Sequence, residues 1–276
     1  MKSGDGCTIT SLFMRSSQTT QAIVLRARPY GESDKIVSFL TEDFGKLTGI
    51  AKGALRSRRR FVNSLEPFSL VNLRFQDRTH DNLVFLIGAD LLFGLRRLAS
   101  SLERISYAAY LVEITDGLIS EREENLAVFQ HLRDGLRYLE EIGSSLRFLT
   151  SYELKLLHLA GYRPALDDCQ CCRQARSPVQ LEQWHFSPAD GGVLCDSCSR
   201  RRCEVLPLSH LAANMLSTLQ TVSHDLGNRV LLPTSVIREM RAVLLRFIQY
   251  QMDREIKSAA FLNQFSALEN PVSLRI

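Results

Sequence analysis

The sequence predicts an α+β protein with two main parts, an N-terminal β-barrel of the OB type and a C-terminal helical bundle that carries an inserted cysteine module. Three observations predict it. Five short runs of strand character lie before about residue 95, the apolar periodicity then changes from two residues to about 3.6, and five cysteines lie between residues 169 and 198. A chain of 276 residues with 45% apolar residues is long enough to bury two cores.

The barrel is expected over residues 19–95, after a flexible leader of residues 1–18 that is short, mixed in character and without periodicity. Turn residues separate its expected strands. These strands are predicted at residues 20–28, 34–42, 46–53, 68–76 and 82–90. Because an open sheet of five short strands would leave unpaired edges, a closed OB-type barrel is favoured.

A basic segment follows the third predicted strand and comprises Lys52, Arg56, Arg58, Arg59 and Arg60. Guanidinium groups at this density suit phosphate oxygens, because they donate paired hydrogen bonds and release condensed counterions on binding. The first 80 residues hold 13 Lys and Arg against 7 Asp and Glu, so the basic character is concentrated at this end. The segment therefore predicts contact with a polyanion.

The alternative for this segment is a solvated loop that adds only solubility. Its expected position at the rim of a barrel favours binding, since aromatic residues stand nearby in the sequence. Tyr30, Phe61 and Phe68 could supply rings for bases beside charges for the backbone, although the same rings could belong to the core.

The helical region is expected over residues 96–276. Its first helix is predicted to follow a cap at Ser100 or Ser101 and to bury a stripe that includes Leu102 and Val112, and the third is predicted to end at Gly161. The helices are predicted at residues 101–119, 125–142, 146–162, 209–224 and 234–257.

The cysteine module is expected at about residues 165–203. Two C-x-x-C pairs lie in it, Cys169 with Cys172 and Cys195 with Cys198. Two cysteines separated by two residues on a tight turn can aim both sulfurs at one point, and two such pairs supply the four tetrahedral ligands that Zn²⁺ prefers. The module therefore predicts one zinc ion per chain.

Four thiolates would fill the coordination shell and leave no position for water, so the expected zinc is structural rather than catalytic. Cys171, Cys203 and His185 are expected not to bind it. A zinc enzyme or a thiol oxidoreductase is the alternative, but a dithiol site would lack the accompanying βαβ pattern. No P-loop, nucleophile elbow or H-E-x-x-H motif is present, so no catalytic residue is predicted and the protein is not expected to be an enzyme.

Membrane insertion is not expected. The longest apolar stretch, residues 83–95, is interrupted by Asp90 and is too short to span a bilayer, and the N-terminus lacks the apolar segment of a signal peptide. We therefore expect a cytoplasmic protein without a membrane partner.

Four stretches together carry a resemblance to a known family. They are "AIVLRARPYGESDKIVSFLTEDFGKLTGIAKGALRSRRRF" and "LEPFSLVNLRF" in the expected barrel, "GGVLCDSC" in the cysteine module and "DREIKSAAFL" near the C-terminus. With them, and in the order of its parts from about residue 19, the chain resembles the RecO family of bacterial DNA repair proteins.

This resemblance implies an OB domain that binds single- and double-stranded DNA, followed by a helical domain with zinc. It also implies annealing of complementary strands, and loading of RecA together with RecR on DNA coated by single-strand binding protein, whose C-terminal tail is the expected contact. By residue match, the basic segment corresponds to the family's DNA-binding stretch, and the four paired cysteines to its zinc ligands. A zinc-containing RNA-binding or transcription-associated adaptor built from the same parts is the alternative.

Overall fold

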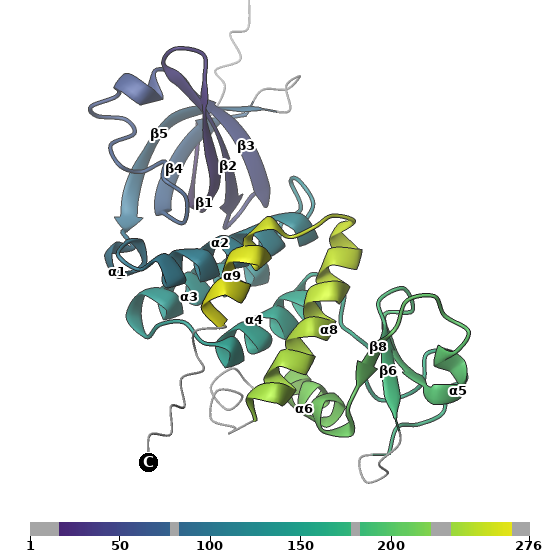
Figure 1. Ribbon diagram of the computed structural model, residues 1–276. Coiled ribbons are helices and arrows are strands. Elements are labelled where there is room, and N and C mark those ends of the chain that lie inside the picture. The colour runs from purple at the N-terminus through teal and green to yellow at the C-terminus, as the bar shows by residue number, and fades with distance from the viewer. Residues whose placement is uncertain (1–16, 78–82, 178–182, 222–232, 267–276) are drawn as a thin grey trace, which may run out of the picture.

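The computed structural model describes residues 17–77, 83–177, 183–221 and 233–266. A β-barrel stands on a bundle of helices, and a small sheet with a short helix lies against the far side of that bundle (Figure 1). Residues 1–16 of the expected leader lie outside the described residues. Within the described residues, no helix is long and apolar enough to cross a membrane.

Five strands form the barrel, which closes in the order β1-β2-β3-β5-β4. The pairing of β3 with β5 is parallel, and the other pairings are antiparallel. The strands are β1 (Gln18–Tyr30), β2 (Asp34–Thr41), β3 (Lys46–Ala51), β4 (Leu70–Gln76) and β5 (Val84–Phe93). The prediction of a closed, OB-like five-stranded barrel is confirmed, with strand ends that differ from the predicted ones by a few residues.

A bulge in β1 joins the barrel to the helices. The register with β2 shifts between Val24 and Arg26, so that the strand carries one extra residue, Leu25. Val24 points into the barrel core, whereas Leu25 belongs to the buried cluster of the helical region. Ile23 and Leu40 also belong to that second cluster. The barrel is therefore packed onto the helices through apolar side chains on its outer surface.

The helices begin where the sequence offers capping side chains. Ser101, Asn125 and Ser145 each accept a hydrogen bond from the backbone N–H three residues later, which satisfies one of the free donors of the first turn. The helices are α1 (Arg96–Ala99), α2 (Leu102–Leu118), α3 (Leu126–Glu141), α4 (Leu146–Leu159), α6 (His210–Thr221), α8 (Thr234–Met252) and α9 (Lys257–Ser266).

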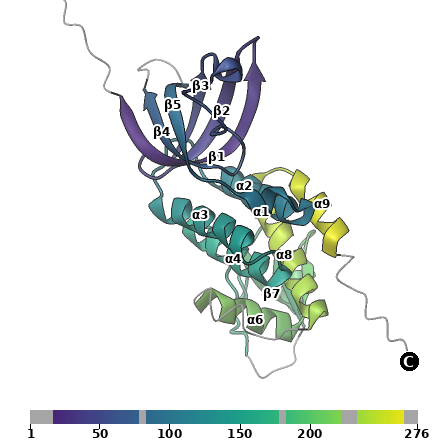
Figure 2. The same cartoon turned by 90° about the vertical axis from the view of Figure 1, so that its left-hand side faces the viewer.

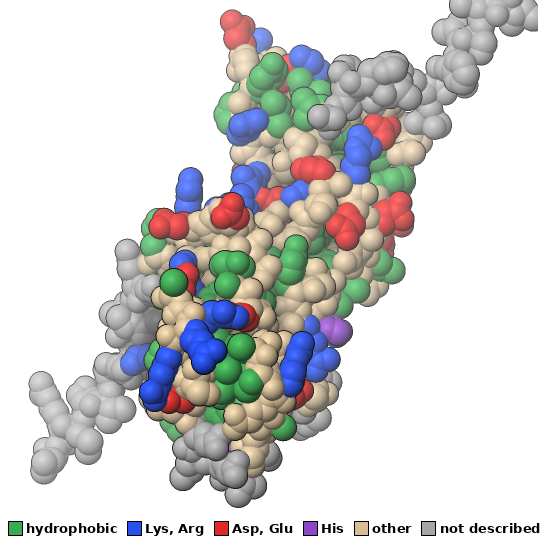
Figure 3. All heavy atoms as spheres, turned by 90° about the vertical axis from the view of Figure 1, so that its right-hand side faces the viewer, with side chains coloured by type: hydrophobic (Ala, Val, Ile, Leu, Met, Phe, Trp, Pro, Cys, Tyr) green, Lys and Arg blue, Asp and Glu red, His purple; other side chains and the backbone are tan. Residues whose placement is uncertain are grey.

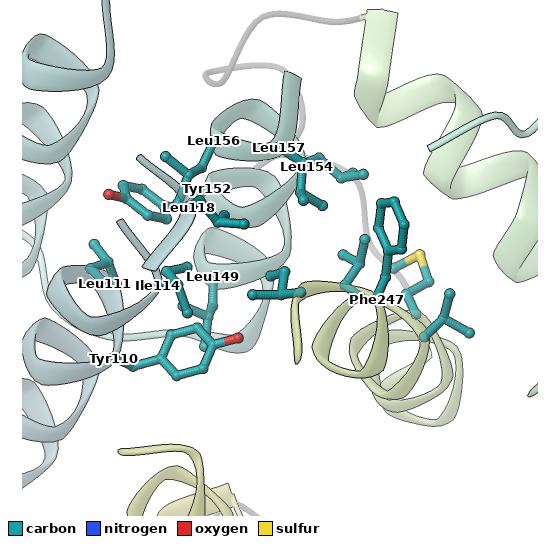
Figure 4. Close-up of a cluster of buried hydrophobic side chains, with 14 of the residues drawn as sticks. Tyr110, Leu111, Ile114, Leu118, Leu149, Tyr152, Leu154, Leu156, Leu157 and Phe247 are labelled. Carbon is teal, nitrogen blue, oxygen red and sulfur yellow. The ribbon is translucent and has the colours of Figure 1, made fainter. Parts of the chain in front are cut away.

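Helix α2 is the centre of the bundle and contacts α3, α4, α8, α9 and β1 (Figure 2). In Figure 4 the Ile114 side chain of α2 lies beside Leu149 of α4, and the Tyr110 ring lies between α2 and the side on which Phe247 of α8 is drawn. The predicted single stripe is wrong in part, because α2 is buried on most of its circumference while Leu102 is 67% exposed at its first turn. A helix surrounded by neighbours has no one-sided pattern to detect.

The last predicted helix is in fact two. Helix α8 ends at Met252, where Asp253 takes a left-handed conformation with φ 49°, and α9 begins at Lys257. The carboxylate of Glu113 on α2 accepts hydrogen bonds from the backbone N–H groups of Lys257 and Ser258, at 3.0 and 2.8 Å, and from the Ser258 hydroxyl at 2.6 Å. A side chain 144 residues earlier thus caps α9. The predicted helix at 209–224 is described from His210 to Thr221, and its last residues lie outside the described part.

The cysteine module contains β6 (Trp184–Ser187), β7 (Gly192–Cys195), the short helix α5 (Asp196–Ser199) and β8 (Leu206–Leu208). The sheet order is β7-β6-β8. The Phe186 ring of β6 meets the Phe247 ring of α8 edge-on, with centroids 5.3 Å apart. The module therefore packs directly on α8 and shares the buried cluster of the bundle.

Candidate metal centre and nucleic-acid interface

The four paired cysteines lie together. The sulfur atoms of Cys169, Cys172, Cys195 and Cys198 are all within 4.8 Å of one another. They come from two segments about two dozen residues apart, so the fold, rather than one local turn, assembles the set. Four converging thiols form a donor set that can hold a metal ion, and soft sulfur ligands in this number favour Zn²⁺ or an iron–sulfur centre over hard cations.

Two different local structures present the sulfurs. The first pair stands in a tight turn, closed by hydrogen bonds from the Cys169 N–H to the Gln174 carbonyl and from the Arg173 N–H to the Cys169 carbonyl, both 2.9 Å. Arg173 takes a positive φ of 62° there. The second pair follows β7 directly, because Cys195 is the last residue of that strand and Cys198 lies in α5.

The surroundings of the site favour thiolates at its inner positions. The Cys195 N–H donates to the Cys169 sulfur at 3.4 Å. Burial acts to raise the pKa of Cys195, but hydrogen bonds from the Ser197 hydroxyl and the Cys198 backbone outweigh it and lower the pKa to about 6. Since a metal binds thiolate and not thiol, the hydrogen bonds to Cys195 favour the form of that residue that can act as a ligand.

The three residues that are predicted not to bind the metal, Cys171, Cys203 and His185, are outside this set of four. Cys171 and Cys203 are exposed to solvent. His185 stands on β6 between partners on β7 and β8, and its Nδ1 is buried without a hydrogen-bond partner among the described residues. Of the described residues, the four paired cysteines are thus the ones that converge on a possible metal position.

Many of the charges around the module are already paired. Figure 3 looks onto the face of the molecule that includes the module, where Lys and Arg side chains gather beside acidic ones. Arg202 makes two hydrogen bonds to Asp190, at 2.6 and 2.8 Å, and Arg200 pairs with Asp196 at 2.6 Å. Such pairs leave less free positive charge on this face than the count of arginines indicates.

The basic segment lies in the connection between β3 and β4, at the end of the barrel away from the helices (Figure 1). It contains the short 3₁₀ helix η1 (Ala54–Arg56). Arg56, Arg58 and Arg59 are exposed, and none of them has an ion pair or hydrogen bond to another residue in the described part of the chain through its side chain. Three guanidinium groups are thus free to meet an external anion.

The two ends of the segment have structural contacts as well. Lys52 pairs with Asp34 at 2.7 Å, and this bond holds the pKa of Asp34 below its ordinary value. Arg60 donates to the Lys52 carbonyl at 2.7 Å, and its own carbonyl accepts from the Ala89 N–H at 2.9 Å. Lys52 and Arg60 therefore shape the loop, while the three arginines between them stay available.

The nearby aromatic residues differ in accessibility. Phe61 is 6% exposed and belongs to the barrel core, under the guanidinium of Arg60 at 5.2 Å from the ring centroid. Phe68 is half-buried and packs against the helical cluster. Tyr30 at the end of β1 is 52% exposed. Of these three rings, Tyr30 is the one presented to solvent.

A buried acid, a phenol and a guanidinium meet inside the bundle. Glu153 is fully buried. Its carboxylate accepts a hydrogen bond from the Tyr110 hydroxyl and forms an ion pair with Arg241 at 2.7 Å. Burial raises the pKa of Glu153, and burial together with the Glu153 charge raises that of Tyr110. No solvent-exposed surface reaches Glu153, so this trio stabilises the packing of α2, α4 and α8 and has no access to a substrate.

An ionic cluster joins barrel and bundle, and no local sequence pattern predicts it. The Lys46 ammonium donates to the carbonyls of Asp116 and Ile119 at 2.9 Å each, and lies 3.4 Å from the Asp116 carboxylate. Arg26 bonds that carboxylate too, and Arg254 is 3.9 Å away. Helix α2 has no basic residue in its last turn. A lysine from β3 therefore compensates the partial negative charge at its C-terminal end.

Comparisons with known proteins agree with this architecture. The model for recombination protein O N terminal matches residues 14–94, and the model for recombination protein O C terminal matches residues 99–260. A DNA repair protein RecO from Syntrophus aciditrophicus is 34% identical over 256 residues, which cover 92% of this chain and 98% of that protein. The protein of the same name from Myxococcus xanthus is 33% identical over 243 residues, covering 88% and 96%. One from a Thermoanaerobacter strain is 28% identical over 246 residues, covering 88% and 96%.

Proposed function

The chain belongs to the RecO family, and from this premise we propose that it is a DNA repair and recombination mediator. In this role it binds single- and double-stranded DNA, anneals complementary strands, and helps RecR to load RecA on DNA coated by single-strand binding protein. The proposed place of action is the cytoplasm, at the nucleoid. Neither binding nor annealing needs a covalent step, so the proposed activity requires positive surface rather than catalytic groups.

The observation that carries the proposal is the exposed arginine group on the barrel. Arg56, Arg58 and Arg59 project from the β3–β4 connection without partners in the described residues. A guanidinium that is not paired to a carboxylate loses no internal ion pair when it binds a phosphate. The loop therefore supplies sequence-independent contacts to a DNA backbone.

Annealing follows from the same electrostatics. Two complementary strands repel one another through their phosphates, and cations that neutralise part of that charge lower the repulsion. Contacts to the backbone alone leave the base edges free to find their partners. The exposed loop of cations therefore supplies part of the charge neutralisation that annealing needs.

We propose that the four-cysteine site holds one structural Zn²⁺ ion. The ion would be bound by Cys169, Cys172, Cys195 and Cys198 and would join the turn that precedes β6 to the end of β7. Two of these cysteines are buried in the cluster that the module shares with α8. The metal would therefore stabilise the module and the bundle surface beneath it. Its ligands begin about 110 residues after the proposed DNA contacts in the sequence.

The proposed partners are RecR and the C-terminal tail of single-strand binding protein, with RecA as the protein whose loading depends on them. The support for these partners is family membership alone. A test of the whole proposal is annealing of complementary oligonucleotides coated with single-strand binding protein, without nucleotide. Failure to anneal them, under conditions where the chain is folded and binds zinc, would remove the mediator assignment.

The arginine loop is tested by the variant Arg56→Ala, Arg58→Ala, Arg59→Ala, which keeps the structural contacts of Lys52 and Arg60. Three lost phosphate contacts should lower the slope of log affinity against log salt by about 2 for single-stranded DNA. A matched control removes three exposed cations of the helical region that have no ion pair within the described ranges, Lys155→Ala, Arg163→Ala and Arg238→Ala. Unchanged affinity and salt dependence in the loop variant would contradict the assignment.

The relative affinity of the chain for DNA and RNA distinguishes a DNA repair mediator from an RNA-binding adaptor. Single-stranded DNA and RNA of one sequence are made to compete for the chain. Backbone contacts by arginines predict similar affinities, whereas a clear preference for RNA requires contacts to 2′-hydroxyl groups and would favour the adaptor.

A further inference from the structure

A groove separates the outer face of the barrel from the bundle. It has a volume of about 1050 Å³ and is lined by residues of β1, β2 and β3 on one side and of α2 and α9 on the other. A second, smaller hollow of about 390 Å³ shares Arg26, Ser38 and Arg254 with it. The two hollows are therefore adjacent at the junction of barrel and helices.

The register of the barrel strands shows how this groove continues toward the basic segment. Ala27 packs against the barrel core, so its neighbours Arg26 and Arg28 point outward, and Tyr30 follows at the same spacing. Tyr30 pairs with Asp34, which in turn bonds Lys52 at the start of the basic segment. The outward side chains of β1 therefore form a line from the groove to the arginine loop.

Across the sheet, this outer face has the composition of a nucleic-acid platform. Arg28 stands opposite Ile36, which stands opposite Ile50, and both isoleucines are half-buried. Nearer the helices, Ser38 and Thr48 are hydrogen-bonded to each other at 3.0 Å. A cation beside an apolar, uncharged floor can hold a phosphate while the floor contacts bases.

The acidic groups of the groove are mostly occupied. The Glu113 carboxylate accepts three hydrogen bonds at the start of α9, and Asp116 is surrounded by Arg26, Lys46 and Arg254. By contrast, Arg28 on β1 and Lys257 on α9 are exposed and have no side-chain partner in the described part of the chain. Glu255 in the larger hollow and Glu121 in the smaller one are the remaining exposed acids of the described lining.

Helix α9 also presents an aromatic ring to this groove. Phe261 lines it and is 57% exposed, one turn beyond Lys257. Residues four apart on a helix lie on one face, so the ammonium and the ring are neighbours. A cation with an adjacent open ring is the pair that single-stranded nucleic acid requires, one for the backbone and one for a base.

We propose that single-stranded DNA runs from the arginine loop along the outward face of β1 into this groove, where Lys257 contacts a phosphate and Phe261 stacks on a base. This inference rests on the proposed function and adds to it that the helical region shares in DNA binding. The charges of the groove support this inference. Arg28 and Lys257 line the groove from its two sides, neither is paired with an acid in the described residues, and both can therefore bind phosphates. Because the outward side chains of β1 continue to the arginine loop, they define the path of the DNA strand between the loop and the groove.

The test compares two groove variants and the arginine-loop variant of the full chain by fluorescence anisotropy with a length series of oligothymidylates at several salt concentrations. Arg28→Ala with Lys257→Ala should lower the salt slope by about 1.4, the amount for two phosphates. Phe261→Ala should weaken binding roughly fivefold or more, as loss of one stacked base predicts. Both effects should appear with long oligomers and vanish with oligomers too short to reach beyond the loop.

Matched controls remove the same groups elsewhere. Lys155→Ala with Arg163→Ala deletes two exposed cations, and Tyr250→Ala deletes an exposed ring on α8 that is outside both hollows. These variants should bind all lengths as the unaltered chain does.

The arginine-loop variant separates the two levels of the proposal. If it loses affinity while the groove variants bind long oligomers normally, the groove inference is wrong and the proposed function stands. If DNA affinity is unchanged in the groove variants but annealing of DNA coated by single-strand binding protein is lost, the groove serves a protein partner, which also overturns the inference. If neither group of variants changes DNA affinity, the proposed interface itself fails.

Discussion

Replacement of Lys46 by methionine tests the connection between barrel and bundle. The ammonium of Lys46 is buried and serves two carbonyls at the end of α2, each at 2.9 Å, in addition to the Asp116 carboxylate at 3.4 Å. Methionine keeps most of the apolar stem, so the change removes the polar contacts with little change in volume. The two carbonyls lose their charged donor, and the end of α2 loses its compensating charge.

The expected loss follows from these contacts. A hydrogen bond to a charged group contributes about 1.5–3 kcal/mol, and removal of one partner from a buried ion pair costs about 3–5 kcal/mol. Asp116 keeps Arg26 as a partner in the variant, so its carboxylate is not left alone. We therefore expect a loss near the lower limit, about 3 kcal/mol, equivalent to a fall in Tm of about 6–12 °C for a chain of this size.

The natural control is Lys52→Met. Lys52 is also bonded to a carboxylate, at 2.7 Å, but its side chain is 52% exposed, and exposed ion pairs contribute about 0–1 kcal/mol. Urea titration and thermal melting of both variants provide the comparison. A Lys46→Met protein within 1 kcal/mol of the unaltered chain, or one no less stable than Lys52→Met, would refute the assignment of Lys46 as the contact that holds α2 to the barrel.

Three further predictions concern the module and the bundle. Cys195→Ser should abolish binding of one equivalent of Zn²⁺, measured by metal analysis, and lower the Tm; unaltered thermal stability with the metal lost would contradict a structural site. Gly135→Ala should destabilise the bundle by about 1–3 kcal/mol in urea titration, since the new Cβ would lie 2.6 Å from the Tyr152 ring; stabilisation, as helix propensity alone predicts, would show that the ring moves freely. Burial acts to raise the pKa of Glu113, but its hydrogen bonds from Ser258 and Lys257 outweigh this and lower it. The resulting stabilisation of α9 is complete above the ordinary pKa of a glutamate and is lost as the pH falls through the lowered value. Hydrogen exchange at the start of α9 should therefore accelerate at acid pH, beyond the intrinsic pH effect, in the unaltered chain but not in Glu113→Gln.

The parts of the fold that sequence patterns predicted are those controlled by neighbouring residues. Strand runs, turn residues and the helix cap predicted at Ser100 or Ser101 act within a few positions, and their predicted places agree with the structure to a few residues. The caps at Asn125 and Ser145 are equally local, although only the helices that they begin were predicted. The same holds for each C-x-x-C turn, in which two sulfurs meet by local geometry. For this reason the barrel, the order of the parts and the two C-x-x-C pairs could be inferred from the sequence, whereas the fold brings the two pairs together.

Other features depend on partners distant in the chain, and no local pattern announces them. Lys46 caps a helix that ends 72 residues later, Glu113 caps α9, and the burial of α2 on most sides conceals the stripe that a surface helix would show. Whether a cation is free or paired is likewise a matter of what lies beside it in space, as the difference between Arg58 and Arg202 shows.

The sequence by itself therefore predicts the reactive groups of this chain, which are thiols at metal-binding spacing and a cluster of arginines after a strand. The arrangement in space added which of those charges remain available and where they lie. It joined Arg28 of the barrel and Lys257 of the last described helix across one groove, although 229 positions separate them in the chain. Periodicity and turn chemistry report on hydrogen bonds between near neighbours, whereas a surface is made by the packing of elements whose contacts have no fixed spacing in sequence.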